Sequence, residues 1–289
     1  MPWLSSVAFL TSVAVTASPT PAAQAGPFFN MMRVLKAGEV DQYSLSMSGI
    51  VQVEAPSCGK KEASFETSAG SRFEVLSVRS SSGLAKVRQV VTLDPKLIEK
   101  LKAKGWSDFD RSVLDCTGTM DARSRVTLSP FGKFLASRRA PSSLGQVSGD
   151  CIPLPSKPVR VGDTWQVAMP FSSVFGTQHP VWKSTLLGSG VLNGRPIWLI
   201  KTSTHVALKT DSDKLALIGA PSAVSAKTDG ELWTLDGFAD TSGVGSVDQE
   251  SGKTVRLDLN VTLSFTAASG KEKGTVTLTM NQLKQMTSS

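Results

Sequence analysis

The sequence predicts a mainly β (α+β) protein with large, curved antiparallel sheets and one clear helix. Apolar and polar residues alternate in several long segments, the strongest of which runs from Val255 to Phe265. Such alternation is typical of strands with one buried and one solvated face, as in antiparallel sheets. Helical periodicity is scarce, and turns rich in Gly, Ser and Pro separate the alternating segments.

The C-terminal segments predict an antiparallel hairpin. Alternation ends near Phe265, the stretch Ala268–Lys271 is turn-like, and Val276–Met280 then alternates with threonines. Similar alternation at Tyr43–Val53 and Ala85–Leu93 predicts further strands.

The clear helix is predicted at about residues 95–104. Asp94 is a typical N-cap, Pro95 suits the first helical position, and Gly105 is a typical stop. A short second helix is expected to follow, capped by Ser107. Its apolar side would consist of Phe109, Val113 and Leu114.

The N-terminus predicts an exported protein. Leu4–Ala17 is apolar and uncharged, and Ala23-Gln24-Ala25 fits a small-x-small cleavage site. These features are typical of a secretory signal peptide at residues 1–25, although no Lys or Arg precedes the apolar run. An apolar N-terminal strand is the alternative. We expect a periplasmic or extracellular protein without a transmembrane segment in the mature chain, because no later apolar run approaches about 20 residues.

The formal net charge of +7 is spread along the chain. Nucleic-acid binding favours a basic stripe interleaved with aromatic residues, and this pattern is missing. We therefore expect no nucleic-acid partner. A diffuse positive charge is compatible with peripheral contact with anionic envelope surfaces.

Three cysteines, Cys58, Cys116 and Cys151, leave three possible disulfides. An oxidising compartment favours one bond. The turn-like surroundings of Cys116 and Cys151 favour that pair. The sequence contains no Cys-x-x-Cys, so it supports neither a thioredoxin-type motif nor a zinc knuckle.

The chain divides into two similar β-rich halves, residues 26–153 and 154–289. Each half has a strand, a turn at Ser82-Gly83 or Asn193-Gly194, and a second strand. Gly132 and Gly252 mark a later turn in each half at a similar offset. A degenerate duplication explains this order, and the alternative is that β-hairpins resemble one another in any case.

The stretch Leu154–Trp165, which we call the seam, joins the two halves. Pro155 and Pro158 hold it extended. Val159 and Val161 predict a short strand, Gly162-Asp163 predicts a turn, and Trp165 is expected to enter the core of the second half. The candidate structural residues of the seam are Pro155, Pro158, Val161, Gly162, Asp163 and Trp165.

The seam resembles the Leu-Pro-x-Lys-Pro-Val-x-Val-Gly-Asp-x-Trp stretch of an uncharacterised family of exported bacterial proteins, a domain of unknown function. That family also has turns like Ser129–Lys133 and Asp248–Gly252. The resemblance covers nearly all of the mature chain, implies two β-rich repeats and brings no catalytic residues. The architecture is also similar to periplasmic lipoprotein carriers, whose curved sheets wrap a helix and hold acyl chains, but a fold does not fix a function.

Histidine and serine motifs for catalysis are weak. His179 and His205 have no nearby His or Glu in sequence and read as surface imidazoles. No Gly-x-Ser-x-Gly elbow occurs, and Ser57-x-x-Lys60 lacks the Lys-Thr-Gly partner of penicillin-recognising enzymes. Gly252-Lys253-Thr254 reads as a hairpin turn rather than a phosphate loop.

Acidic pairs at Asp108/Asp110 and Asp211/Asp213 more often mark helix starts than a catalytic cleft. The tryptophans read as core anchors with satisfied N–H groups rather than a sugar or lipid platform. They are Trp106, Trp165, Trp182, Trp198 and Trp233.

The sequence therefore favours a non-enzymatic envelope protein with no catalytic residue, cofactor or metal. Its concave sheet face would bind an apolar ligand, a lipid or another envelope protein. A structural or interaction module without a small ligand is one alternative, and a carboxylate-dependent hydrolase is another.

Overall fold

The computed structural model describes residues 26–56, 59–96, 99, 113–128, 152–169, 171–173, 176–178, 180–211, 234–268 and 273–288. The first five strands are β1 (Val40–Ala55), β2 (Gly59–Val78), β3 (Ala85–Leu93), β4 (Val113–Met120) and β5 (Val126–Leu128). The short strands β6 (Thr164–Ala168), β7 (Phe171–Ser173) and β8 (Gly176–Gln178) follow. The chain continues with β9 (Val181–Leu192), β10 (Arg195–Asp211), β11 (Thr234–Asp248), β12 (Thr254–Ala268) and β13 (Lys273–Ser288).

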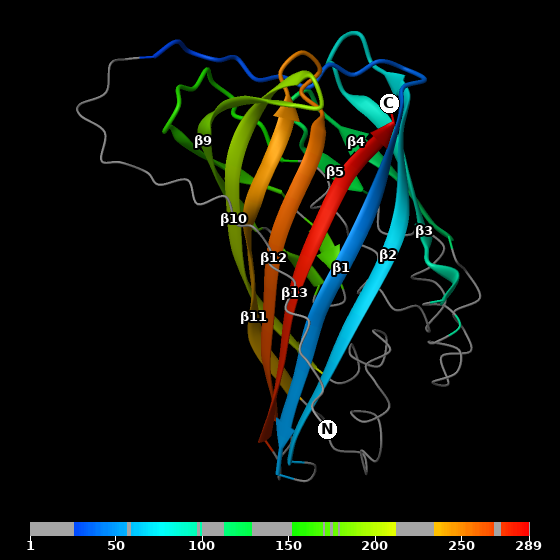
Figure 1. Cartoon of the computed structure of the whole chain (residues 1–289), viewed down its shortest axis with the longest axis vertical. Helices are drawn as coiled ribbons and strands as arrows, with labels where there is room; N and C mark the ends of the chain where they lie inside the picture. Colours follow the sequence, from blue (N-terminus) through cyan, green and yellow to red (C-terminus); the bar gives the residue numbers. More distant parts are fainter. Residues whose placement is uncertain are drawn as a thin grey trace, which may run out of the picture.

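Eleven strands form one sheet in the order β5-β4-β3-β2-β1-β13-β12-β11-β10-β9-β6, and β7 and β8 form a separate pair. All neighbours are antiparallel. The predicted mainly β class is therefore confirmed. Strands of the two predicted halves meet at β1 and β13, and the seam leads into β6, which is the edge strand opposite β5. Figure 1 shows the long strands side by side in a curved sheet, with β4 and β5 behind them.

The long hairpins follow the predicted sequence patterns. The predicted C-terminal hairpin is β12–β13, in which Thr262 pairs with Thr279. β9 and β10 are joined by Asn193-Gly194, and both residues have positive φ (51° and 77°). Two-residue hairpins require such backbone conformations, and Asn and Gly adopt them at low cost. This pattern predicted the turn correctly.

The largest core cluster lies on one face of the sheet and includes Met31 of the N-terminal segment, which crosses the upper end of the sheet in Figure 1. We call this face the core face. The sheet contributes buried side chains such as Ile200 and Leu257, and the segments that cover them contribute Met31, Ile152 and Leu154. A second cluster gathers around Tyr43, Phe73, Val75, Ala85, Val87 and Met120. Apolar burial of this kind is the main favourable contribution to folding.

The N-terminal residues 29–34, which we call the strap, cross the upper end of the sheet (Figure 1). Phe29 forms a two-way backbone bridge with Val159 of the seam. Farther along, the Arg33 N–H donates to the carbonyl of Ala122 in the β4–β5 turn (2.7 Å). The strap therefore bonds to segments next to β6 and next to β5, the two strands at opposite edges of the sheet.

Arg123 strengthens this junction. Its carbonyl accepts a hydrogen bond from the Leu154 N–H (2.8 Å), and its Nη1 donates to the carbonyl of Met31 (2.6 Å). Its Nη2 donates more weakly to the carbonyl of Ser156 (3.3 Å). One side chain in the β4–β5 turn thus contacts both the strap and the seam.

The helix predictions are partly tested. Residues 95, 96 and 99 are helical, and the Lys96 N–H donates to Asp94 Oδ1 (2.9 Å), as expected of an N-cap. The rest of residues 95–104 lies outside the described residues. The prediction of a second helix is wrong at the C-terminal end of that helix, because Val113 and Leu114 belong to β4 and pair with Thr92 and Val91. Apolar residues in so short a run do not distinguish a helix from a strand.

The prediction that Cys116 lies in a turn is also wrong. Cys116 lies inside the strand, where it pairs with Gln89 of β3. Its side chain and Cys58 and Cys151 lie outside the described part of the chain, so the predicted Cys116–Cys151 disulfide stays a prediction.

The seam is a loop anchored at several points rather than a strand. Within the described part of the chain, Val159 pairs only with Phe29, and Val161 is 56% exposed, so the expected Val159–Val161 strand is wrong. Gly162 has a φ of 91°, and its N–H donates to the carbonyl of Leu186 (2.7 Å). The strand prediction failed because the partner of Val159 is the strap, which ends its pairing before Val161.

The remaining seam residues fix the approach to β6. Asp163 accepts a hydrogen bond from the Arg160 N–H through Oδ2 (2.8 Å). Trp165 packs against the main core cluster, and its Nε1 donates to the carbonyl of Pro153 (2.9 Å). Pro155 is buried, and Pro158 is exposed directly before Val159. Trp165 thereby couples the start of β6 to Pro153, the residue directly before the seam.

Replacement of Trp165 by Ala should lower the free energy of unfolding by about 3 kcal/mol, because the indole fills core volume and binds Pro153. Val161→Ala, in the same loop but exposed, should change stability by less than about 0.5 kcal/mol. Urea denaturation followed by circular dichroism would measure both. Equal stability of the two variants would contradict an anchoring role for Trp165.

Candidate functional site

The apolar alternation of β12 continues past the point where its burial stops. Leu257 and Leu259 are buried, whereas Val261, Leu263 and Phe265 are half-buried. All five side chains lie on the core face, because alternate residues of a strand share a face. Beyond Asn260 the polar and apolar faces of β12 are both half-buried through Thr266. The apolar face of β12 is therefore longer than the core that covers it.

On the neighbouring strands, the side chains of the core face change from buried to half-buried at a similar level. On β1, Leu45 is buried and Val51 is half-buried, and on β2, Ala69 is buried and Phe65 is half-buried. Strand register places these transitions side by side, because Leu45 pairs with Ala69 on one side and with Lys284 of β13 on the other. The boundary between the filled and the half-filled core face thus lies at a similar level on β12, β13, β1 and β2, one residue pair lower on β12 than on β13.

Below this boundary, the core face carries rows of apolar side chains. Val51 pairs with Leu278, and Leu278 pairs with Leu263, so the three side chains form one row across β1, β13 and β12. The next row is made in the same way by Val53, Val276 and Phe265, and the row above by Gly49, Met280 and Val261. We call these nine residues the lower apolar rows. Their aliphatic and aromatic surface suits an apolar ligand, and none of them can act as an acid, a base or a nucleophile.

Four charged side chains form a cluster beneath the strap. The buried Asp41 accepts hydrogen bonds from Arg33 Nη2 (3.0 Å, to Oδ2) and Lys253 Nζ (2.6 Å, to Oδ1). Glu39 contacts the same two cations, with 3.4 Å between its Oε2 and Arg33 Nη2. Two positive and two negative charges compensate one another, which offsets part of the cost of removing them from water.

The β11–β12 turn places Lys253 in this cluster. Asp248 Oδ1 accepts hydrogen bonds from the Ser251 N–H (2.7 Å) and hydroxyl (2.6 Å). Gly252 has a φ of 67°, and a Cβ there would lie 2.2 Å from the carbonyl oxygen of Met32. The turn therefore needs glycine both for its backbone conformation and for its close contact with the strap.

The cluster also sets the ionisation of Glu39. Burial alone raises the pKa of this carboxyl, but the hydrogen bond from Lys253 and the positive charges of Arg33 and Lys253 lower it more. The pKa of Glu39 is therefore below its usual value. A general acid at neutral pH needs a raised pKa, so Glu39 is suited to an ion pair rather than to proton donation.

A cavity of about 490 Å³ opens beside this cluster. Glu39 and Lys253 reach it from the cluster, and Lys36, Arg195 and Glu250 add charges of both signs. Since Glu39 and Lys253 bind each other at the cavity wall, the arrangement favours a structural role for them.

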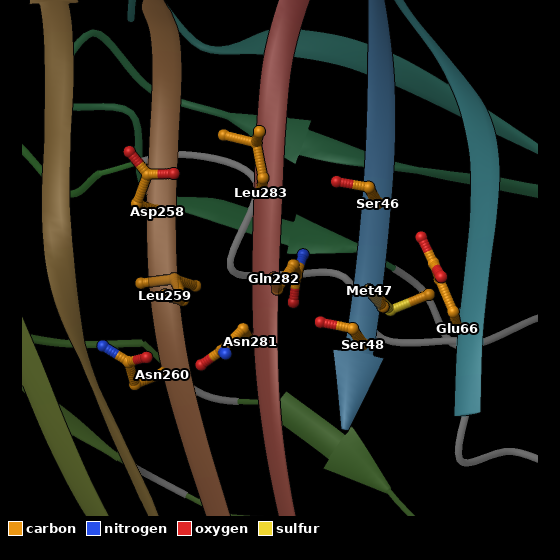
Figure 2. Close-up of a pocket in the computed structure, with 10 residues that line it drawn as sticks. All are labelled: Ser46, Met47, Ser48, Glu66, Asp258, Leu259, Asn260, Asn281, Gln282 and Leu283. Atoms are coloured by element: carbon orange, nitrogen blue, oxygen red, sulfur yellow. The ribbon is translucent and has the colours of Figure 1, made fainter. Parts of the chain in front are cut away.

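A second cavity, of about 310 Å³, is lined by β1, β2, β12 and β13 (Figure 2). Most of its lining side chains, including Ser46, Ser48 and Asn281, belong to the polar face opposite the core. Its carboxylates Glu66 and Asp258 have two strands between them. At about 4.8 Å per strand, their backbones are roughly 14 Å apart or more, whereas glycosidase carboxyls lie about 5–10 Å apart. This cavity does not favour the hydrolase alternative.

His205 has a partner that the sequence did not reveal. Its Nδ1 lies 2.6 Å from Asp240 Oδ1, and its ring stacks on Phe238 at 5.7 Å. Both members of the pair are more than half exposed. Asp240 faces His205 only because β10 and β11 pair in that register, so nothing in the local sequence could predict the contact.

The tryptophan prediction is correct for Trp165, whose N–H is satisfied, and partly wrong for Trp198. Trp198 is buried in the main cluster, edge-on to Phe29 at 6.5 Å, but no described residue forms a hydrogen bond with its Nε1. Trp182 is half-buried on β9. Several predicted features lie outside the described residues: Ser57, Trp106, Asp108, Asp110, 129–133, His179, Asp213 and Trp233.

The described residues contain no group of three or more His, Cys, Asp and Glu side chains arranged to hold a metal ion. Within the same residues, no helix is both long enough and apolar enough to cross a membrane.

Comparisons with known proteins give little information about this chain. No family model matches it, and no curated protein matches it. Among solved structures, it is similar to a DUF1329 family protein from Desulfovibrio piger ATCC 29098, at 8% identity and a TM-score of 0.14, over 83% of this chain and 84% of that one. A likeness of this strength carries no argument about ligand or activity.

The lowered pKa of Glu39 predicts a pH dependence of stability. A carboxylate whose pKa is lowered by folding stabilises the protein above the unfolded pKa of about 4.3, and this contribution is lost as the pH falls through the folded value. Glu39→Gln should therefore lose less stability than the wild type between pH 6 and pH 3. Urea denaturation across this range provides the measurement.

Glu54→Gln is the matched control, because Glu54 is an exposed carboxylate at the far end of β1. It should keep the pH dependence of the wild type. If Glu39→Gln and Glu54→Gln behaved alike, the cluster would not be the source of the acid sensitivity.

Proposed function

We propose that this protein is a non-enzymatic, exported envelope protein that binds an apolar ligand, such as the acyl chain of a lipid, on the lower apolar rows. The observation that carries the proposal is that the apolar surface of the core face extends farther along the strands than the core that covers it. Apolar side chains continue along β1, β12 and β13 where burial by the upper core ends.

A ligand on these rows would gain free energy from the surface that it covers. Each 100 Å² of apolar surface removed from water contributes about 2.5 kcal/mol. The three rows lie one below another along the strands rather than closing into a compact pocket, and this shape suits an extended chain better than a globular ligand. The absence of ionisable groups in the rows suits a hydrocarbon rather than a polar metabolite.

The two ends of the sheet would then have different roles. The upper end is filled by Met31, Ile152 and Leu154 and is fixed by the charged cluster. Rigid packing there would hold the long strands in register, while the lower rows would remain available for ligand. The predicted signal peptide at residues 1–25 supports a role in the envelope, where lipids have to be bound and moved.

Leu278→Lys should reduce the amount of lipid that co-purifies with the protein at least tenfold, because it places a charge in the centre of the lower apolar rows. Organic extraction followed by mass spectrometry would measure the lipid per mole of protein. Thr279→Lys is the matched control, since Thr279 is the exposed next residue of β13 and faces the opposite side of the sheet.

Circular dichroism would confirm that both variants keep the fold. If the wild type carried no lipid, and added fatty acid also failed to bind it, the proposed function would be wrong. The same conclusion would follow if the two lysine variants lost lipid equally.

A further inference from the structure

The burial of the strap alternates from one residue to the next. Met31 and Arg33 are buried and Phe29 is half-buried, whereas the residues between them are exposed. Consecutive N–H groups also donate in different directions, since that of Arg33 bonds to the β4–β5 turn and that of Val34 bonds to the β11–β12 turn. An extended segment turns alternate side chains to opposite sides. The outward side, which we call the outer strap row, consists of Phe28, directly before the strap, and of Asn30, Met32 and Val34.

The outer strap row is largely apolar although it faces water. Phe28 is 59% exposed, Met32 42% and Val34 44%. Phe29 and Met31 already attach the strap to the core, so the fold does not require apolar residues on the opposite side. The distance along the chain from Phe28 to Val34 is about 20 Å at a rise of about 3.3 Å per residue. An exposed apolar patch that is rimmed by polar groups marks an interaction site.

Positive side chains flank both ends of the outer strap row. At one end, the Arg160 guanidinium lies 3.9 Å from the centroid of the Phe28 ring. Arg123 Nη1 donates weakly to Asn30 Oδ1 there (3.4 Å). The predicted cleavage after residue 25 would add the α-ammonium group of Gly26 close to Phe28 in the chain. At the other end, the cavity beside the charged cluster is lined by Val34, Lys36 and Arg195.

Positive charge is in excess around this row. Two exposed carboxylates, Asp163 and Glu250, lie near the same cations. Asp121 is already bound by Arg125 (2.6 Å), and the charges of the cluster beneath the strap compensate one another. The cations that remain are Lys36, Arg123, Lys157, Arg160 and Arg195.

We propose that the outer strap row docks the protein onto the surface of an anionic lipid bilayer. Phe28, Met32 and Val34 enter the interfacial layer, and the flanking cations contact the phosphates of the headgroups. Apolar side chains surrounded by Lys and Arg are typical of peripheral binding to anionic membranes. The inference rests on the export that is part of the proposed function, but it concerns a surface separate from the lower apolar rows.

The layered chemistry of a bilayer suits this surface. An anionic bilayer presents negative charge at its surface and an apolar layer beneath it, which matches cations at the base of protruding apolar side chains. Phe28 and Met32 line neither of the two cavities described above, so they form a ridge rather than a groove. A ridge needs a partner that yields to it. An acidic protein surface is the competing occupant, and it offers the charge without the yielding apolar layer.

Co-sedimentation of the exported protein with lipid vesicles tests the proposal. Vesicles with about 30% phosphatidylglycerol in phosphatidylcholine provide the anionic surface, and pure phosphatidylcholine provides the neutral one. Every variant is purified from the envelope, so that all share the same processed N-terminus. The wild type should bind the anionic vesicles about tenfold more tightly than the neutral ones, because the flanking cations contribute only to the former.

Apolar variants test the contact itself. Phe28→Ser and Met32→Ser should each weaken binding to anionic vesicles about fivefold or more, because they remove apolar surface from the contact. Ile50→Ser is the matched control, since Ile50 is 42% exposed, as Met32 is, but lies on the polar face of β1. It is about 30 Å from Asp41 along this strand, at a rise of about 3.3 Å per residue. This variant should bind like the wild type.

Charge variants test the flanking cations. Lys36→Gln should weaken binding to anionic vesicles about fivefold, whereas Lys61→Gln, an exposed lysine near the lower end of β2, should not. Raising the salt concentration from about 0.1 M to about 1 M shortens the Debye length from about 10 Å to about 3 Å and should weaken wild-type binding. Leu278→Lys should leave vesicle binding unchanged, so this inference and the proposed function can fail separately.

Three outcomes would contradict the inference. A wild type that does not bind anionic vesicles would leave an acidic protein surface as the occupant to examine. Equal binding to neutral vesicles would exclude a role for the cations. Phe28→Ser and Met32→Ser variants that bind like the wild type would place the contact on another surface. Circular dichroism of each variant separates a lost contact from a lost fold.

Discussion

The upper end of the molecule depends on the pairing of Asp41 with Arg33 and Lys253. Asp41 lies at the start of β1, Arg33 belongs to the strap, and Lys253 follows the β11–β12 turn. One buried carboxylate therefore joins the N-terminal strap and β1 to a turn that is 212 residues away in sequence. Removal of one member would leave an uncompensated charge in a region with little water, which is strongly destabilising. This constraint holds the strap where it bonds to the seam and to the β4–β5 turn, near both edges of the sheet.

A sheet whose edges are tied together at one end has two different ends. Packing of the strap and the seam fills the core face near Leu257 and Leu259, and farther along the same strands the apolar side chains of Val261 and Leu263 are only half-buried. Because long strands keep their alternation over their whole length, they extend an apolar surface beyond the core that stabilises them. The proposed ligand would occupy the part of this surface that the folding of the upper core does not require.

Particular residues show where prediction from sequence succeeded. The alternation at Val255–Phe265 and the Asn193-Gly194 turn specified strands and a hairpin, because these signals act between residues that are close in the chain. Val113 and Val161 show where it failed. Each lies in a short apolar pattern that fits two structures, and the strand pairing of Val113 and the exposure of Val161 were decided by partners far away in sequence.

The sequence by itself determined the mainly β class, the hairpins and the faces of the long strands, because side-chain alternation and turn residues are local properties. Only the tertiary structure decided that Lys253 is a buried ion-pair partner rather than an exposed turn lysine, and that His205 faces Asp240. It also decided where the core ends along β12. These features depend on strand register and on chain crossings, which bring together residues that no local pattern relates.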